Sequence, residues 1–215
     1  MCLVKEQKKI KAVIFDLDGT LYDNTKLPRY VVMHSLFRLR MLYAERVSRL
    51  HMSGRFFGRK GATYDMLFKR ISQMAGVSVK TVAKWYWEDY LPLQVKMLKR
   101  HFHAKPWVKP LLAELRSKGI KIACFSEYSF IKEKLKALDI DPDSFDYLID
   151  APTAGGCKPC RKAFMYVAAK LNVYPSEILV VGDREDTDGA GADSANMQFL
   201  LCPRQDTQKL DIEVV

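Results

Sequence analysis

The 215-residue sequence has no apolar run long enough to cross a lipid bilayer. Its N-terminal residues become charged before an apolar signal segment could form, which argues against secretion. The five cysteines are odd in number and scattered, unlike the cysteine framework of a small secreted domain. Internal repeats and low-complexity tracts are also missing. We therefore expect a cytoplasmic protein that does not engage a membrane.

Acidic residues are scarce in the segment 26–105. It contains 17 lysines and arginines but only 4 aspartates and glutamates, a net charge of +13. Because the whole chain carries +10, the remaining residues together carry −3. Such a positive segment can draw anions toward a site, but runs of charge often form no more than a solvated face. The sequence leaves both possibilities open, along with a less favoured role in docking a nucleic acid or an acidic protein.

Outside this segment, short apolar runs alternate with helical patterns. With 48% hydrophobic residues, the chain can bury a substantial core. Strands are expected at 10–15, 120–125, 147–149, 178–181 and 197–201. Helices are expected between them, at 111–117, 130–138, 162–171 and 188–194. This alternation predicts an α/β fold with a Rossmann-like, parallel five-stranded sheet, built from residues 1–25 and 106–215.

The segment 26–105 has the periodicity of helices instead. Its first part predicts an amphipathic helix in which one stripe carries Val32, Leu36, Leu39, Tyr43, Val47 and Leu50. A second helix is expected at 64–74, where Gly76 stops it. A third, with a serine N-cap, is expected at 78–90, where Pro92 breaks it. The segment is therefore expected to be an all-helical cap inserted into the core.

Two carboxylates follow the first expected strand. Asp16 and Asp18 are two residues apart near its end, so continued chain alternation would direct both side chains the same way. Gly19 then allows the backbone to turn sharply beneath them. One carboxylate can attack phosphorus as a covalent nucleophile, while the second exchanges a proton with the leaving oxygen. The pair therefore predicts phosphoryl-transfer chemistry, with an ordinary Asp-Gly turn as the alternative.

Polar groups also follow three later strands. Asp183 and Asp188 come after the fourth strand and suit a hard cation that accepts oxygen ligands. Lys158 precedes an expected helix and could hold a phosphoryl oxygen, and Ser126 closes the second strand with a hydroxyl. Ligands bind outside the carboxyl ends of the strands in an open parallel sheet. These groups can therefore meet Asp16 in one site.

In order and spacing, these residues resemble the four motifs of the haloacid dehalogenase-like superfamily, in its phosphatase branch with a helical cap between the first two motifs. The segment 16–20 matches the first motif, and the resemblance covers nearly the whole chain. It implies that Asp16 is the nucleophile, and that Asp18 is the general acid and then the base. It also implies that magnesium binds Asp16, the backbone carbonyl of Asp18, and Asp183. The dehalogenase branch lacks an aspartate at the position of Asp18, which favours phosphate chemistry here.

The resemblance implies roles for the other motif residues as well. Ser126 and Lys158 would bind the transferring phosphoryl group, with Lys158 also acting in catalysis, and Asp188 would orient the metal site and Lys158. Two positions depart from the family's pattern. Glu127 stands where many members have asparagine, and Cys160 stands where relatives often have aspartate. A negative charge at Glu127 would disfavour a nearby phosphate unless the side chain points away.

Two further features offer competing interpretations. Ser129 lies close enough in sequence to replace Ser126 in the hydroxyl role. Cys157 and Cys160 form a Cys-x-x-Cys pair, but no second pair of cysteines or histidines stands at zinc-finger spacing. A metal or redox role for the two cysteines is therefore disfavoured.

The function implied is that of a magnesium-dependent phosphatase that hydrolyses a small phosphate monoester through an aspartyl-phosphate on Asp16. A phosphomutase of the same branch is the nearest alternative, since it would hand the phosphoryl group back to a sugar hydroxyl. A non-catalytic protein that docks an acidic partner through its basic segment is the second alternative. The joint presence of Asp16, Asp18, Lys158 and Asp183 argues against it.

Overall fold

The computed structural model describes residues 9–58, 61–205 and 212, so Cys2 lies outside the described residues. Its strands are β1 (Ala12–Phe15), β2 (Lys121–Ser126), β3 (Tyr147–Asp150), β4 (Ile178–Gly182) and β5 (Gln198–Leu201). They form one five-stranded sheet in the order β3-β2-β1-β4-β5, and every pairing is parallel. The expected Rossmann-like α/β sheet is therefore confirmed.

The central strand β1 is buried along its whole length, and its alternate side chains enter two different cores. Val13 and Phe15 pack into the larger core, whereas Ala12 and Ile14 pack into the smaller one. The larger core includes α6 (Val108–Ser117) and α7 (Ile131–Ala137), and the smaller includes α8 (Arg161–Leu171) and α9 (Ala190–Ser194). Helices therefore cover both faces of the sheet, which explains why its strands are uniformly apolar. Three short helical turns lie in the loops around the sheet: η3 (Pro142–Ser144), η4 (Pro175–Glu177) and η5 (Glu185–Gly189).

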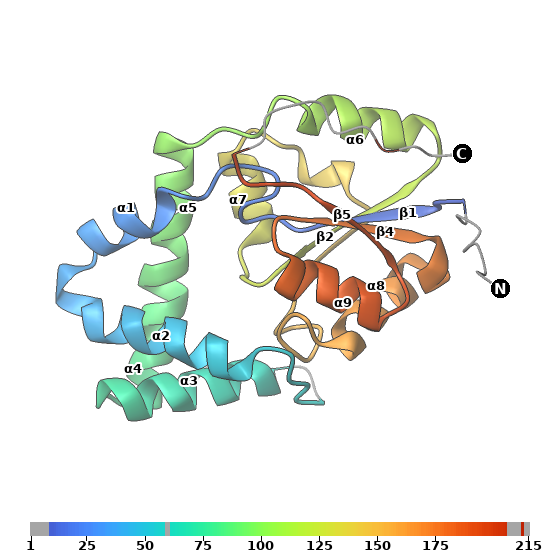
Figure 1. Cartoon of the computed structure of the whole chain (residues 1–215). Coiled ribbons are helices and arrows are strands. Elements are labelled where there is room, and N and C mark those ends of the chain that lie inside the picture. Colours follow the sequence, from blue (N-terminus) through green and yellow to red (C-terminus); the bar gives the residue numbers. More distant parts are fainter. Residues whose placement is uncertain (1–8, 59–60, 206–211, 213–215) are drawn as a thin grey trace.

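Between β1 and α6 the described residues form helices gathered on one side of the molecule (Figure 1). These are α1 (Leu27–Met33), η1 (Leu36–Arg38), α2 (Leu39–Met52), α3 (Ala62–Ala75), α4 (Val79–Lys84), η2 (Trp85–Tyr90) and α5 (Leu91–His101). As expected, Gly76 ends α3 with a positive φ of 69°, and the Ser78 hydroxyl caps α4 by accepting the Thr81 N–H at 3.1 Å. Among the described helices, none is both long and apolar enough to cross a membrane.

The expected amphipathic helix is wrong in two respects. The chain leaves the α-helical conformation between α1 and α2, which are joined through η1. The expected stripe also faces solvent, and its exposed members are Val32, Leu36, Leu39, Tyr43 and Leu50. The residues that α2 buries are Met41, Ala44, Glu45, Ser48, Arg49 and Met52. The inner face of α2 thus includes hydrogen-bonded polar groups, which a search for apolar periodicity does not find.

The expected helix end at Pro92 is also wrong. The helix continues from α4 through the π-helical turn η2 into α5, and Pro92 lies in the first turn of α5. A proline has no N–H to donate within a regular α-helix. The π-helical turn just before Pro92 changes the hydrogen-bond pattern at this point, so the chain continues in the same direction.

The end of β4 shows how the fold brings one predicted site residue into place. The strand ends at Gly182, and η5 then returns the chain so that the buried Asp188 side chain lies over the strand end. A Cβ atom on Gly182 would lie 2.4 Å from the Cβ atom of Asp188. Only glycine allows the carboxylate to approach the strand this closely.

We expect Gly182→Ala to lower the free energy of unfolding by about 1–3 kcal/mol, because overpacking forces the backbone or Asp188 to shift. Chemical denaturation measures the change. The matched control is the same substitution in an Asp188→Gly variant, where the colliding side chain is absent and the cost should fall by roughly half or more. An equal loss of unfolding free energy in both backgrounds would show that the Asp188 side chain is not what excludes a larger residue at position 182.

Candidate active site

The predicted site residues come together at the carboxyl ends of the strands. Asp16 and Asp18 follow β1, Ser126 ends β2, and the loop after β3 carries Lys158. The segment after β4 adds Asp183 and Asp188. Hydrogen bonds join these segments: Lys158 contacts Asp16 and Asp188, and Ser126 contacts Asp18. Residues more than 100 positions apart in the sequence therefore form one cluster.

Lys158 lies between two carboxylates. Its Nζ atom is 2.8 Å from Asp16 Oδ1 and 2.8 Å from Asp188 Oδ1, and all three side chains are less than 10% exposed. The second Asp16 oxygen accepts a hydrogen bond from the Thr20 hydroxyl at 3.0 Å. Burial raises the pKa of Asp16 to about 6, although the Lys158 ammonium opposes this rise. Burial would lower the pKa of Lys158, but the carboxylates of Asp16 and Asp188 outweigh burial and raise it, so Lys158 stays charged.

Asp18 has a separate set of partners. Its Oδ1 atom accepts from the Tyr22 hydroxyl at 2.6 Å, and its Oδ2 atom accepts from the Ser126 hydroxyl at 3.1 Å. The Nζ atom of Lys134, a fully buried residue of α7, is 2.9 Å from both oxygens. Burial alone would raise the pKa of Asp18, but Lys134 and the two hydroxyl donors outweigh burial and lower it. The two carboxylates of the first motif therefore differ in charge partner and in pKa.

Three carboxylates could share a cation. Oxygen atoms of Asp16, Asp183 and Asp188 all lie within 4.8 Å of one another. Gly19 allows the first-motif loop to approach closely, because a Cβ atom there would lie 2.5 Å from Asp183 Oδ2. Burial is the largest cause of a raised pKa at each of the three carboxyls, so a cation among them would offset the cost of burying their charge. This set of hard oxygen donors fits Mg²⁺.

The predicted magnesium ligands, which are Asp16, Asp183 and the backbone carbonyl of Asp18, stay a prediction. The backbone carbonyl of Asp18, a predicted ligand, accepts a hydrogen bond from Asn24 Nδ2 at 2.8 Å, while Asp188 joins the carboxylate cluster directly. Arg204, which follows β5, also contacts the Asp183 carboxylate. Its guanidinium supplies a positive charge that no pattern in the sequence predicted.

Four residues of the site were missed by the sequence analysis. Thr20 contacts Asp16 and Tyr22 contacts Asp18, each from four positions later in the chain. This regular spacing could have indicated both hydroxyls as partners of the two carboxylates. Lys134 falls between Ile131 and Leu135, on the buried face of α7, where a lysine needs a charged partner. Arg204 gave no such signal, because it lies in an irregular segment beyond the last strand.

The competing residues lie elsewhere. Ser129 donates to Asp150 Oδ2 at 2.6 Å and is 2.8 Å from the Tyr64 hydroxyl, so its hydroxyl is committed away from Asp18. Cys157 and Cys160 are buried free thiols. Burial raises the pKa of Cys157, which disfavours the thiolate that metal binding or redox chemistry needs.

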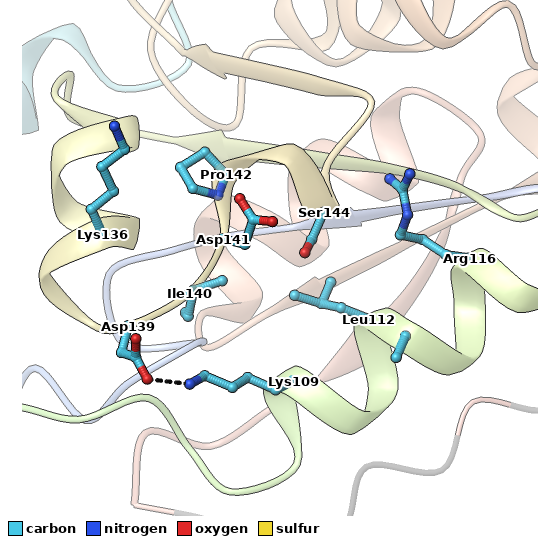
Figure 2. Close-up of a pocket in the computed structure, with 10 residues that line it drawn as sticks. Lys109, Leu112, Arg116, Lys136, Asp139, Ile140, Asp141, Pro142 and Ser144 are labelled. Carbon is cyan, nitrogen blue, oxygen red and sulfur yellow. Dashed lines mark hydrogen bonds and ion pairs between the residues drawn. The ribbon is translucent and has the colours of Figure 1, made fainter.

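A surface pocket between α6 and the segment that follows α7 is not part of this cluster (Figure 2). In this view Lys109 and Asp139 point toward each other and form an ion pair. Residues 139–144 lead into the amino end of β3, whereas the carboxylate cluster lies at the carboxyl ends of the strands. None of the residues that line the pocket belongs to the cluster.

Comparisons with known proteins identify relatives of this chain. A sequence model of the haloacid dehalogenase-like hydrolases matches residues 10–196. The chain is 28% identical over 229 aligned positions to the glyceraldehyde 3-phosphate phosphatase of Methanopyrus kandleri, covering 95% of this chain and 93% of that protein. It is 28% identical over 204 positions to the phosphoglycolate phosphatase of Escherichia coli, covering 85% and 78%. Its fold is similar to the β-phosphoglucomutase of Clostridium difficile, with a TM-score of 0.62, 23% identity, and coverage of 88% and 83%. The chain belongs to the haloacid dehalogenase-like hydrolases.

Proposed function

We propose that this hydrolase is a magnesium-dependent phosphatase that acts on a small phosphate monoester through an aspartyl-phosphate on Asp16. The observation that carries the proposal is the division between the two carboxylates of the first motif. Asp16 faces Lys158 and the carboxylate cluster, while Asp18 is held by Lys134, Tyr22 and Ser126. Neighbouring carboxylates in different environments can take different roles in one reaction.

In the first half of the reaction, an Asp16 oxygen attacks phosphorus and the bond to the leaving oxygen breaks. Asp18 gives that oxygen a proton, and Lys158 offsets negative charge on the phosphoryl oxygens. Bound Mg²⁺, held by Asp16 and Asp183 with Asp188 nearby, would supply further charge neutralisation. In the second half, Asp18 takes a proton from the water that hydrolyses the acyl phosphate. The lowered pKa of Asp18 suits this second step, and the incoming phosphate dianion would favour the protonated form needed for the first.

The helical segment 26–105 is proposed to act as a cap on a core made of residues 1–25 and 106–215. Arg49 of α2 donates hydrogen bonds to Glu127, and Tyr64 of α3 donates one to Asp150. Both helices therefore contact residues of the proposed core. Such a cap would exclude bulk water and select the substrate. The named phosphatases that resemble this chain support a small phosphorylated metabolite as the substrate.

A phosphomutase remains the second candidate, because the fold is similar to that of a β-phosphoglucomutase. The two activities differ in the acceptor of the phosphoryl group, which is water in one and a sugar hydroxyl in the other. Incubation of the enzyme with sugar monophosphates, followed by analysis of both inorganic phosphate and isomerised sugar phosphate, separates them. Release of phosphate without isomerisation supports the phosphatase.

Asp16→Asn should lower the rate of phosphate release by about a thousandfold or more, because it removes the nucleophile while keeping the side-chain volume. Release of inorganic phosphate from a panel of phosphorylated metabolites measures the effect. The control is Asp186→Asn, since Asp186 is an exposed carboxylate paired with Arg184 outside the cluster. A variant that keeps a tenth of the wild-type rate would exclude covalent catalysis by Asp16.

Mg²⁺ should raise the melting temperature of the protein, because a cation that binds only the folded state stabilises it. At a free Mg²⁺ concentration 100 times its dissociation constant, the free energy of unfolding would rise by about 2.7 kcal/mol. EDTA should reverse the shift, and Asp183→Asn should reduce it by removing one charged ligand. Thermal unfolding with and without Mg²⁺ tests this, again with Asp186→Asn as the control. An equal shift in both variants would place the cation elsewhere.

Lys134→Met should slow the hydrolysis of the phosphorylated enzyme. Lys134 lowers the pKa of Asp18, so its removal raises that pKa and leaves less of the ionised base at a given pH. The acidic limb of the kcat profile should therefore move to higher pH, and phosphorylated enzyme should accumulate with an activated aryl phosphate. Lys136→Met, at an exposed position of α7, is the control. An unchanged pH profile in Lys134→Met would show that Lys134 does not tune Asp18.

A further inference from the structure

Glu127 points away from the carboxylate cluster and toward α2. Its Oε1 atom is 3.3 Å from Arg49 Nη1, and its backbone carbonyl accepts from the same nitrogen at 3.0 Å. Its Oε2 atom accepts the backbone N–H of Lys158 at 3.1 Å. The Glu127 carboxylate, at a position where many members of the family have asparagine, therefore contacts Arg49 of the cap and the backbone N–H of Lys158.

Arg49 is fixed on the cap side of this contact. The residue is 8% exposed, and its guanidinium pairs with Glu45 one turn earlier in α2. It also donates to the Tyr86 hydroxyl at 2.5 Å and lies 4.2 Å from the centre of the Tyr128 ring. A guanidinium with this many partners holds one orientation. Glu127 thus meets a rigid group of the cap rather than a mobile surface side chain.

The end of α2 holds the other polar group of the Lys158 backbone. The carbonyl of Lys158 accepts from the Ser53 hydroxyl at 3.1 Å and from the Gly54 N–H at 3.2 Å. Next to this contact, Phe56 and Gly156 form an antiparallel β-bridge. The N–H of Lys158 is therefore held by Glu127, and its C=O by the cap.

The side chain of Lys158 depends on this backbone clamp. Its Nζ atom must lie within 2.8 Å of both Asp16 and Asp188 at the far end of a flexible stem. A shift of the backbone by about 1 Å would misplace the ammonium, and errors of that size can cost about a hundredfold in rate. The position of the cap is thus linked to Asp16 through one residue, Lys158, whose two backbone polar groups belong to consecutive peptide units.

We propose that Glu127 is a positioning residue that, together with Arg49, seats the α2 edge of the cap on the core and fixes Lys158 beside Asp16. The expected effect on catalysis rests on the proposed phosphatase function. The contacts that hold the Lys158 backbone do not depend on that proposal.

The experiment compares Glu127→Ala, Arg49→Met, the double variant and Glu127→Gln, with Glu177→Ala as the control. Glu177 is paired with Lys11 in the core, away from the cluster. With an aryl phosphate and Mg²⁺, each single variant should lower kcat by about 10–100-fold while KM changes by less than about threefold. The double variant should be no slower than the slower single variant, because both break the same clamp. Glu127→Gln keeps an acceptor for the Lys158 N–H and should recover part of the loss.

Two readouts do not depend on turnover. Calorimetry with Mg²⁺ and beryllium fluoride should show about tenfold weaker binding in Glu127→Ala, because the phosphoryl mimic needs Lys158 in place. Amide hydrogen exchange in the segment 155–158 should speed up about tenfold in Glu127→Ala and in Arg49→Met, and if one of these variants fails to fold the other supplies the measurement. Exchange unchanged in these variants, or kcat losses that multiply in the double variant, would overturn the proposal. Faster exchange in a protein without phosphatase activity would uphold the clamp and reject the proposed function instead.

Discussion

The ion pairs that Lys158 forms with Asp16 and Asp188 are the interaction on which the rest of the structure depends. An ammonium and two carboxylates are buried together, each less than 10% exposed. Removing one member of a buried pair typically costs about 3–5 kcal/mol, because the other charge is left without compensation. The three groups come from different segments, after β1, β3 and β4. The sheet order and the close approach at Gly182 both serve to bring them within hydrogen-bond distance.

A second buried lysine divides the site into two parts. Lys134 compensates Asp18 in the same way that Lys158 compensates Asp16, but from α7 on the other side of the first-motif loop. Each carboxylate of the motif thus has its own cation, and the two environments shift their pKa values in opposite directions. A motif of two carboxylates separated by one residue could not reach this difference through local sequence alone.

The sequence was informative where structure is local or repetitive. The strands followed from short apolar runs, and the site followed from the rule that parallel strands present their carboxyl ends at one edge. It was misleading in α2, where the buried face includes Glu45, Ser48 and Arg49 and the apolar stripe faces solvent. Lys134 and the contact between Arg49 and Glu127 were not found, because pairs 78 to 116 residues apart leave no periodic signal in one sequence.

The position of β1 has a consequence for how the chain acquires its structure. Among the described strands it is the first in sequence and the middle one of the sheet, and Val13 pairs with Ile122 and Leu179. During synthesis from the N-terminus, this apolar strand emerges long before either neighbour exists, whereas α2 and α3 can pack on each other through nearby residues. The inserted helices are therefore expected to form first, with β1 unpaired until about 110 further residues have been made. A chaperone that assists the nascent chain would find an unpaired apolar target in residues 12–15, the same strand that later presents Asp16.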